Sequence, residues 1–234
     1  MTTMLPPRAG YRRVLAIPAV AVVVLFGVWV AGGVVSNDYK TSMALTAVWF
    51  LLSGAACLLV ARRSRALRVV VLGTYLVTAG AVGAYLGLTT LRDRVVHERV
   101  VTAAPATATA AGSSATAAAG KPARAAVELA RGRFRSHEHA TSGDAAIVRL
   151  ADGRRFLTLT SFETSPGPDL RVRLAPGDSF DGGADGAVDL GALKGNRGDQ
   201  QYAVPDNADV ARRTVVIWCR AFSAPFGSAR LPRL

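Results

Sequence analysis

Three long apolar runs dominate the first part of the chain, at residues 14–35, 43–61 and 69–88. None of them contains a charged residue, and each is close to the roughly 20 apolar residues that a helix needs to cross a bilayer. A signal peptide explains the first run poorly, because the apolar core of a signal is about 7–15 residues long. Since a helix satisfies its own backbone hydrogen bonds in lipid, the pattern predicts an anchor of three transmembrane α-helices.

A different pattern begins at residue 126, where short runs typical of β-strands alternate with clusters of Gly, Pro, Asp and Asn. No periodic run of helical length occurs there. Many short strands with turn signals between them are typical of an antiparallel β-sandwich or barrel. The sequence therefore predicts a mainly β soluble domain over 126–234, with strands near 132–136, 145–150, 154–162, 170–174, 188–190, 200–204, 214–221 and 226–231.

Residues 91–125 separate these two regions and contain the stretch TAAPATATAAGSSATAAAGKPAR. This stretch has no aromatic residue and almost no large apolar one, so it cannot bury enough surface to fold. Its Thr, Gly and Pro residues interrupt the alanines, which argues against one continuous helix. We expect 91–125 to be a flexible linker between the membrane anchor and the β domain.

The net charge of +12 is distributed unevenly between the parts of the chain before and after residue 126. The first part carries 13 basic and 3 acidic residues, and the second carries 15 and 13. The basic residues thus accompany the apolar runs, which removes the main argument for a nucleic-acid partner. The bilayer itself is the expected partner.

Orientation in the membrane follows from where the arginines lie. Three precede the first run and four fill the loop between the second and third, whereas the loop at 36–42 has one cation and one anion. The positive-inside rule then predicts a multi-pass protein of the cell membrane, with residues 1–13 in the cytoplasm and the β domain outside it. Arg92, Arg94 and Arg99, just after the third run, argue weakly for the opposite orientation.

The segment TVVIWCRAFSAPFGSARL, at 214–231, holds the most distinctive chemistry. It contains Cys219 beside Trp218, followed at short spacing by Phe222 and Gly227. Side-chain alternation along a strand would place Cys219 among aliphatic residues, where a thiol is an inert core residue with a raised pKa. A redox or ligand-binding thiol and an intermolecular disulfide are the other two interpretations.

His137 and His139 are two residues apart, so on a strand they would share a face. Together with Cys219 they offer two nitrogens and one sulfur, which are ligand types that suit copper or zinc, with Asp144 as a further candidate. Haem bound by Cys219 and His139 is another hypothesis, although no attachment motif for c-type haem occurs. Two exposed histidines entering a turn are the simpler interpretation, and the cofactor stays open.

Hydrolytic chemistry has little support in this sequence. Ser142 lies in a turn without a nucleophile-elbow pattern. The glycine-rich stretch at 191–198 follows no strand-to-helix unit that would bind phosphate. The carboxylates lie mostly at turns, where turn formation explains them. We predict no catalytic residues, and an enzyme is the less expected class.

Four segments carry a family resemblance, and they run in order: GRFRSHEHATSGDAAIVRL, LTSFETSPGPDLRVRL, VDLGALKGNRGDQQYAVP and VVIWCRAFSAPFGSARL. In these segments the β region resembles the DM-thirteen (DM13) domain family, for which electron transfer has been inferred. The resemblance implies a role for Cys219, with Trp218 beside it, and for His139. In larger relatives such domains accompany DOMON domains and haem-binding membrane cytochromes, and neither module is found in this sequence.

Two functions are therefore expected for the β domain. The first is a membrane-anchored redox or electron-transfer role centred on Cys219, with a membrane or surface redox protein as its partner. The second is a non-catalytic adhesion or scaffold module in which Cys219 is structural.

Overall fold

The computed structural model describes residues 8–103, 126–177, 186–210 and 213–232. They form two compact units: the helical region up to Leu91 together with Cys219–Ala224, and the remainder from Arg92 onward. Most of the predicted linker, residues 104–125, lies outside the described residues.

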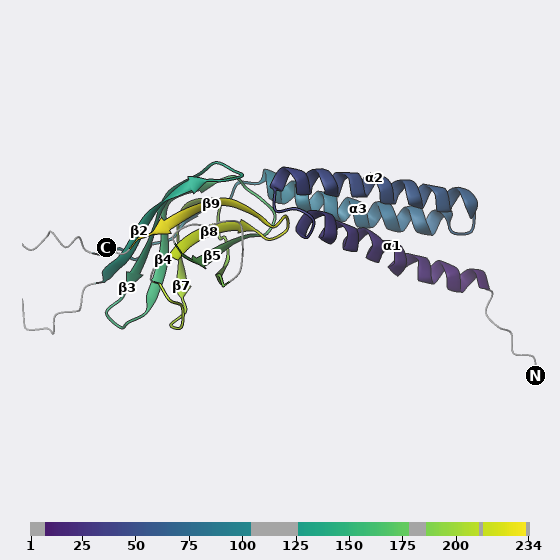
Figure 1. Cartoon of the computed structure of the whole chain (residues 1–234). Coiled ribbons are helices and arrows are strands. Elements are labelled where there is room, and N and C mark those ends of the chain that lie inside the picture. The colour runs from purple at the N-terminus through teal and green to yellow at the C-terminus, as the bar shows by residue number, and fades with distance from the viewer. Residues whose placement is uncertain (1–7, 104–125, 178–185, 211–212, 233–234) are drawn as a thin grey trace, which may run out of the picture. The chain divides into compact units, whose positions relative to one another are not determined.

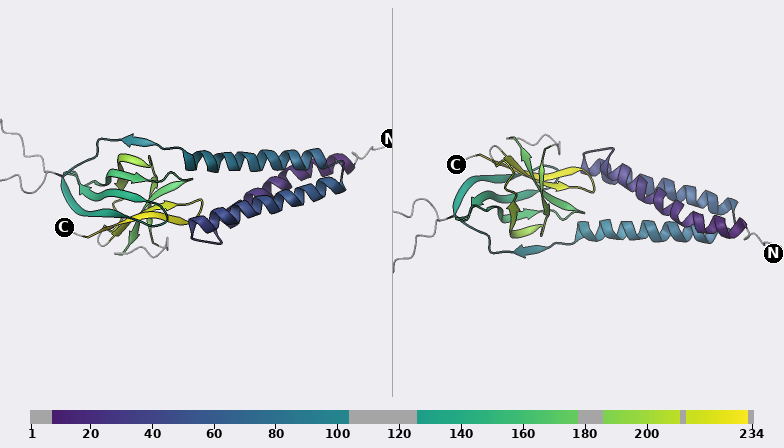
Figure 2. Two further views of the ribbon diagram at one scale, coloured as in Figure 1. Left: turned by 90° about the horizontal axis from the view of Figure 1, so that it is seen from above. Right: turned by 90° about the horizontal axis from the view of Figure 1, so that it is seen from below.

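The first unit contains three helices, α1 (Arg8–Gly33), α2 (Tyr39–Arg63) and α3 (Arg68–Leu91), which contact one another in pairs and converge toward the α2–α3 loop (Figure 2). Each is long and apolar enough to cross a membrane, which confirms the predicted helical anchor. Asp38 ends the loop before α2 and caps that helix, since its Oδ2 accepts a hydrogen bond of 2.7 Å from the backbone N–H of Thr41.

Two glycines allow close approach of these helices. A Cβ atom on Gly27 would lie 1.8 Å from the ring of Trp49, and one on Gly54 would lie 2.9 Å from the hydroxyl of Tyr75. Large rings on α2 and α3 thus occupy spaces that only a missing side chain leaves open. Small residues have this function in many membrane helix contacts.

The second unit is built on one curled, nine-stranded sheet, a half-barrel (Figure 1). The strand order is β1-β7-β4-β3-β2-β9-β8-β5-β6. The strands are β1 (Val95–His97), β2 (Val127–Ser136), β3 (Thr141–Arg149), β4 (Arg155–Thr164), β5 (Leu170–Pro176), β6 (Val188–Ala192), β7 (Arg197–Val204), β8 (Arg213–Cys219) and β9 (Ala224–Leu231). The predicted mainly β fold is confirmed, and each of the eight predicted strands has a counterpart among β2 to β9.

Strand β2 connects the two halves of the curl. Its first part pairs antiparallel with β3 as far as Arg133, and its last part, from Phe134, pairs antiparallel with β9. Gly132 still pairs with β3, two residues before the change, and a Cβ atom on it would lie 1.8 Å from the carbonyl oxygen of Arg230 on β9. The backbones of β2 and β9 therefore meet where β2 changes partner.

The core of the β unit is aliphatic and aromatic. The side chains of Phe134 and Phe162 meet edge to face, with ring centroids 5.1 Å apart, and both are buried. The remaining large buried side chains are contributed by strands from both halves of the curl, and they include Ile147, Leu157, Leu159, Val172, Leu174, Val215, Ile217, Phe226 and Leu231.

The first strand, β1, was not predicted, because residues 91–125 were expected to form a linker. Val95–His97 instead pairs with β7, and this pair is parallel. The expectation of a purely antiparallel sheet is thus wrong at this edge. Three residues are too few to give a pattern, and their partner strand lies about 100 positions later, at Arg197–Asp199.

Candidate functional site

Cys219 is the last residue of β8 and has no exposed surface. Alternation along β8 predicted that one face would bury Val215, Ile217 and Cys219, and these three are 0% exposed. The opposite face is buried as well, because Val216 and Trp218 pack against Ala175 of β5. Neither side of the strand therefore offers solvent a route to the sulfur.

Trp218 precedes the cysteine and is 5% exposed. The guanidinium carbon of Arg173, on β5, lies 5.1 Å from the centre of a Trp218 ring. This is the geometry of a cation–π interaction, which favours a positive charge over the face of an indole ring. The structure thus places a cation against the aromatic neighbour of Cys219.

Phe222 and Ser223 lie in the turn after β8, within the first compact unit. Phe222 is 3% exposed, and its ring meets that of Tyr39 edge to face at 5.1 Å. Ser223 has a left-handed backbone with φ of 46°, which is uncommon for a residue other than glycine, and its hydroxyl donates to the carbonyl oxygen of Gly33 at 2.7 Å. Phe222 therefore packs as an interior aromatic residue.

A second group forms where β2 turns into β3. The rings of His139 and Phe226 lie 3.9 Å apart between centroids, tilted by 32°. The carbonyl oxygen of Phe226 accepts hydrogen bonds from the backbone N–H of His137 at 3.0 Å and of His139 at 3.4 Å, and from the hydroxyl of Thr141 at 3.2 Å. Phe226 is 0% exposed, so it fixes the position of the whole turn.

Gly227 has a clear reason to be glycine. It lies opposite Ser136 in the β2–β9 pairing, and a Cβ atom on it would come within 2.5 Å of the side chain of Thr141. Thr141 is itself held by its hydroxyl contact of 2.9 Å with Thr164. Gly227 thus lets β9 pass close to the start of β3, and its role is structural.

The structure brings some predicted site residues together and leaves others apart. His137, His139 and Gly227 meet around Phe226, and the Nε2 atom of His137 lies 2.7 Å from the hydroxyl of Ser228. In the part of the chain that the structure describes, no three His, Cys, Asp or Glu side chains are grouped to hold a metal ion. Metal binding by His137, His139 and Cys219, with Asp144, stays a prediction.

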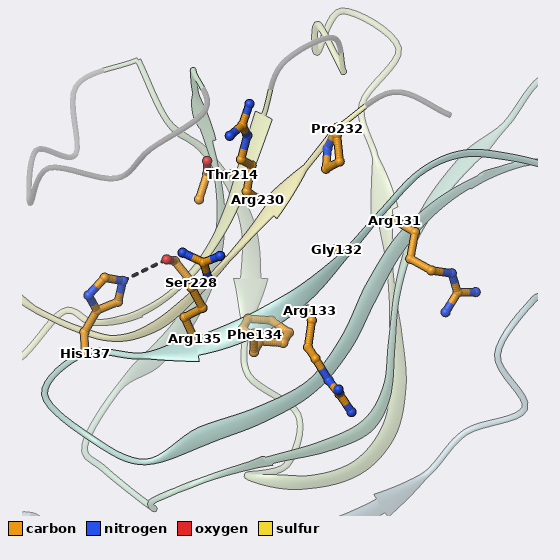
Figure 3. A pocket seen from close by; sticks show the side chains of 10 residues that line it. All are labelled: Arg131, Gly132, Arg133, Phe134, Arg135, His137, Thr214, Ser228, Arg230 and Pro232. Atoms are coloured by element: carbon orange, nitrogen blue, oxygen red, sulfur yellow. Dashed lines mark hydrogen bonds between the residues drawn. The ribbon is translucent and has the colours of Figure 1, made fainter.

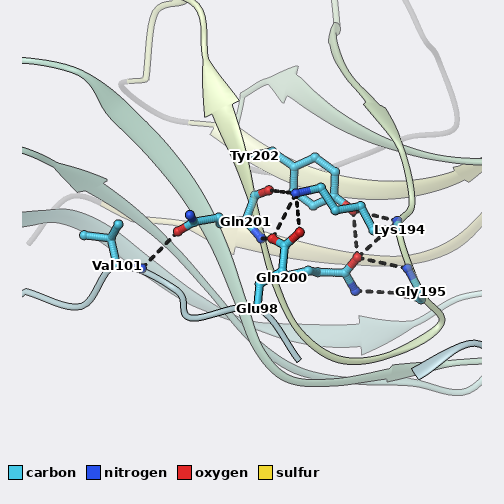
Figure 4. A network of polar contacts seen from close by, with 7 residues as sticks. All are labelled: Glu98, Val101, Lys194, Gly195, Gln200, Gln201 and Tyr202. Atoms are coloured by element: carbon cyan, nitrogen blue, oxygen red, sulfur yellow. Dashed lines mark hydrogen bonds and ion pairs between the residues drawn. The ribbon is translucent and has the colours of Figure 1, made fainter. Parts of the chain in front are cut away.

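A polar network that the sequence did not reveal joins the segment after β1 to β7 (Figure 4). Lys194 Nζ donates to both carboxylate oxygens of Glu98, at 2.7 and 2.9 Å, and to the carbonyl oxygen of Gln201 at 2.7 Å. The Tyr202 hydroxyl donates to Gln200 Oε1 at 2.8 Å, and Gln200 has no exposed surface. Because Glu98 and Lys194 lie 96 residues apart, no local motif could have linked them.

Two pKa values in this network are displaced. Burial acts to raise the pKa of Glu98, but hydrogen bonds from Lys194 and from the N–H of Gln201, together with the charge of Lys194, outweigh it and lower that pKa. Burial raises the pKa of Tyr202 well above its usual range, and the charge of Glu98 adds to this effect. Glu98 thus stays ionised and Tyr202 stays protonated at neutral pH. These charge states fit a structural network and not a site of proton transfer.

Comparison with known proteins gives one match. Residues 133–231 match the family model described as Electron transfer DM13. The matched segment runs from β2 to the end of β9 and includes Cys219, Trp218, His137, His139, Phe222 and Gly227. No curated protein and no solved structure matches the chain.

Proposed function

We propose, from the premise that residues 133–231 form a domain of the DM13 family, that this protein serves electron transfer at a membrane. The family match is the observation that carries the proposal. The three apolar helices support the location, because each is long enough to hold the chain in a bilayer. A membrane or surface redox protein is the kind of partner that such a domain would serve.

Within this function, Cys219 is proposed to hold or contact the redox group of the domain. It lies inside the matched segment, and its neighbour Trp218 is packed under the guanidinium of Arg173. Thiol–disulfide exchange requires an attacking thiolate to reach the sulfur. Because Cys219 is 0% exposed, the proposal includes no disulfide exchange with a partner protein, and Cys219 itself keeps its oxidation state.

Haem and copper are the two cofactors that the sequence analysis named as hypotheses. Among the described residues, His137, His139 and Cys219 form no group of metal ligands that would hold copper. Haem at Cys219 would require the buried surroundings of the sulfur to open. The proposal therefore includes no step through either group.

A scaffold function is the second candidate, and one observation favours it. Cys219 is completely buried on the same face as the aliphatic residues Val215 and Ile217. A buried thiol in apolar surroundings is normally inert and acts as a small hydrophobic residue. In this alternative, the domain presents a surface to other molecules and Cys219 only fills the core.

Replacement of Cys219 distinguishes the two candidates. We expect the full-length chain, purified in zwitterionic nanodiscs with the redox group that it carries, to show a reversible wave in a potentiometric titration. A lone thiol gives no such wave, so we expect Cys219→Ala to abolish it by removing a ligand or contact of that group. The fold should survive, because losing one small apolar group costs about 1 kcal/mol. Cys57→Ala is the matched control, since Cys57 is the other buried thiol and lies in α2.

Other outcomes of this titration are equally clear. A wave that persists in Cys219→Ala would remove the cysteine from the electron-transfer role. If the wild type shows no wave and Cys219 reacts with a thiol reagent only after denaturation, the domain is a scaffold. An absorption spectrum and a metal analysis of the same sample test whether the purified protein carries haem or copper.

The proposed orientation puts the N-terminus in the cytoplasm and the β unit outside it. Its support is the charge distribution: Arg62, Arg63, Arg65 and Arg68 lie in or beside the α2–α3 loop, and cationic loops stay preferentially in the cytoplasm.

Single-cysteine labelling measures this orientation. In a background carrying Cys57→Ser and Cys219→Ala, we expect Ala151→Cys to react with a membrane-impermeant thiol reagent in intact cells. Ala151 lies in the exposed β3–β4 turn. Ala66→Cys, in the exposed α2–α3 loop, should react only after permeabilisation. The reverse pattern would show that the β unit faces the cytoplasm.

A further inference from the structure

An open pocket of about 910 Å³ lies on the β unit, beside the place where β2 changes its pairing partner (Figure 3). It is separate from the Cys219 surroundings and shares only His137 with the turn held by Phe226. Its lining comes from β2, β8 and β9 and the residues that follow β2 and β9, and it consists of Arg131, Gly132, Arg133, Phe134, Arg135, His137, Thr214, Ser228, Arg230 and Pro232.

The arginines reach this pocket because of strand geometry. Arg131, Arg133 and Arg135 alternate with Gly132 and Phe134 along β2, so their side chains leave the same face of the strand. On β9, the half-buried Ser228 and the exposed Arg230 continue this face, because Ser228 is the register partner of Arg135. The Nε2 atom of His137 lies 2.7 Å from the Ser228 hydroxyl and completes the polar side of the pocket.

Positive charge in the pocket is only partly balanced. The lining includes four arginines and no carboxylate. Arg131 is held by Glu128 at 2.7 Å, but the nearest approach of Arg133 to Asp144 is 3.9 Å, and the Arg133 side chain is 84% exposed. Among the described residues, Arg135 makes no ion pair. Such exposed, distant pairs contribute little, so the pocket retains attraction for an anion.

The arrangement favours a ligand with several phosphate groups. A guanidinium presents a planar fork of donors that matches the oxygens of a phosphate. Figure 3 shows the three arginines of β2 spread around the pocket, with their guanidinium groups pointing in different directions. Cations spread in this way suit a ligand that carries more than one phosphate group.

Nucleic acid fits this pocket less well. Proteins that hold single strands combine cations with exposed aromatic rings on which bases stack. Here the aromatic residue between the arginines, Phe134, is 5% exposed and turned toward Phe162 in the core. The pocket thus offers donors for phosphate and no exposed Phe, Tyr or Trp for a base.

We propose that this pocket binds a ligand that presents several phosphate groups, and that Arg133 and Arg135 are its principal ligands. Arg131 and Arg230 line the same space and add to the positive potential, while His137 and Ser228 lie at the Arg135 end. The site does not depend on the electron-transfer role of the domain. The phosphates have two sources with the same chemistry, a soluble polyphosphate-type polymer or the headgroups of an anionic bilayer.

Inorganic polyphosphate is the probe that tests the site. With the full-length chain in zwitterionic nanodiscs, we expect saturable binding that weakens as salt is added, because salt screens exposed charges. Arg133→Gln/Arg135→Gln should weaken binding by about 10- to 100-fold, since it removes the charge-assisted hydrogen bonds. Arg135→Lys should fall between this variant and the wild type, because it keeps the charge and loses the fork.

Arg149→Gln/Arg154→Gln is the matched control. It removes the same charge from exposed positions at the β3–β4 turn, outside the pocket lining. An equal loss in this control would mean general electrostatic attraction and would overturn the proposal. Tighter binding of a single-stranded oligonucleotide through the same arginines would also overturn it. Phosphatidylglycerol vesicles form the second arm: binding to vesicles alone, lost in Arg133→Gln/Arg135→Gln, would identify lipid headgroups as the source.

Discussion

Phe226→Ala is expected to lower the free energy of unfolding of the β unit by about 3–5 kcal/mol, the usual cost of deleting a fully buried phenylalanine ring. The ring is 0% exposed and stacks on His139 at 3.9 Å. A Cβ atom on Gly167 would lie 2.7 Å from it, so the ring fills space left by the absence of a side chain there. Removing it leaves a cavity between β9 and the β2–β3 turn.

Urea unfolding of the full chain in nanodiscs measures this loss, followed by the fluorescence of Trp218 with Trp29→Phe and Trp49→Phe in the background. These two changes remove the tryptophans of the helices, so the signal reports the β unit alone. Phe156→Ala is the matched control: Phe156 is only half-buried, beside Arg154, and should lose about 1 kcal/mol. Equal losses at the two positions would contradict the packing described for Phe226.

The elements that the sequence predicted are those with a local signature. Three uncharged apolar runs gave the three helices, and β-type runs between turn residues gave β2 to β9. Each of these patterns can be recognised within about 20 neighbouring residues. Strand β1 has no such signature, since it consists of Val95–His97 and exists through its pairing with Arg197–Asp199. The ion pair of Glu98 and Lys194 was not predicted either, because its two residues are also far apart in the sequence.

The candidate site was predicted in pieces. His139 and Gly227 were singled out separately, but only the fold shows that both lie around Phe226, which the sequence analysis left out of the candidate residues. Alternation correctly grouped Cys219 with Val215 and Ile217. It could not show that the opposite face, with Trp218, would also be buried, because that depends on packing against Ala175 of β5.

Charge was the least predictable property, because the sequence analysis averaged it over long segments. Residues 127–234 carry 15 basic and 13 acidic residues, which describes a nearly neutral domain. The fold separates these charges, so that four arginines line one pocket while several carboxylates pair elsewhere, as Asp152 and Asp189 do. The alternation RGRFR is visible in the sequence. That its arginines line a pocket could not be predicted, because the pocket also needs residues of β9.

Gly132→Ala should be about as damaging as the loss of a core side chain, with an expected cost of about 3 kcal/mol or more. The added Cβ atom would lie 1.8 Å from the carbonyl oxygen of Arg230 and 2.8 Å from its carbonyl carbon. Both are backbone atoms, so no side-chain rotation can relieve the overlap. Strand β9 would have to move away from β2 close to the point where the pairing partner of β2 changes from β3 to β9.

Gly153→Ala separates this steric cost from the conformational cost of replacing a glycine. Gly153 has a left-handed φ of 92°, but a Cβ atom there meets nothing within 4 Å. Its replacement should therefore cost only the backbone strain, about 1–2 kcal/mol. The same fluorescence-detected unfolding compares the two variants. If Gly132→Ala costs no more than Gly153→Ala, then β2 and β9 are farther apart than described, and the half-barrel is not closed at this point by backbone contact.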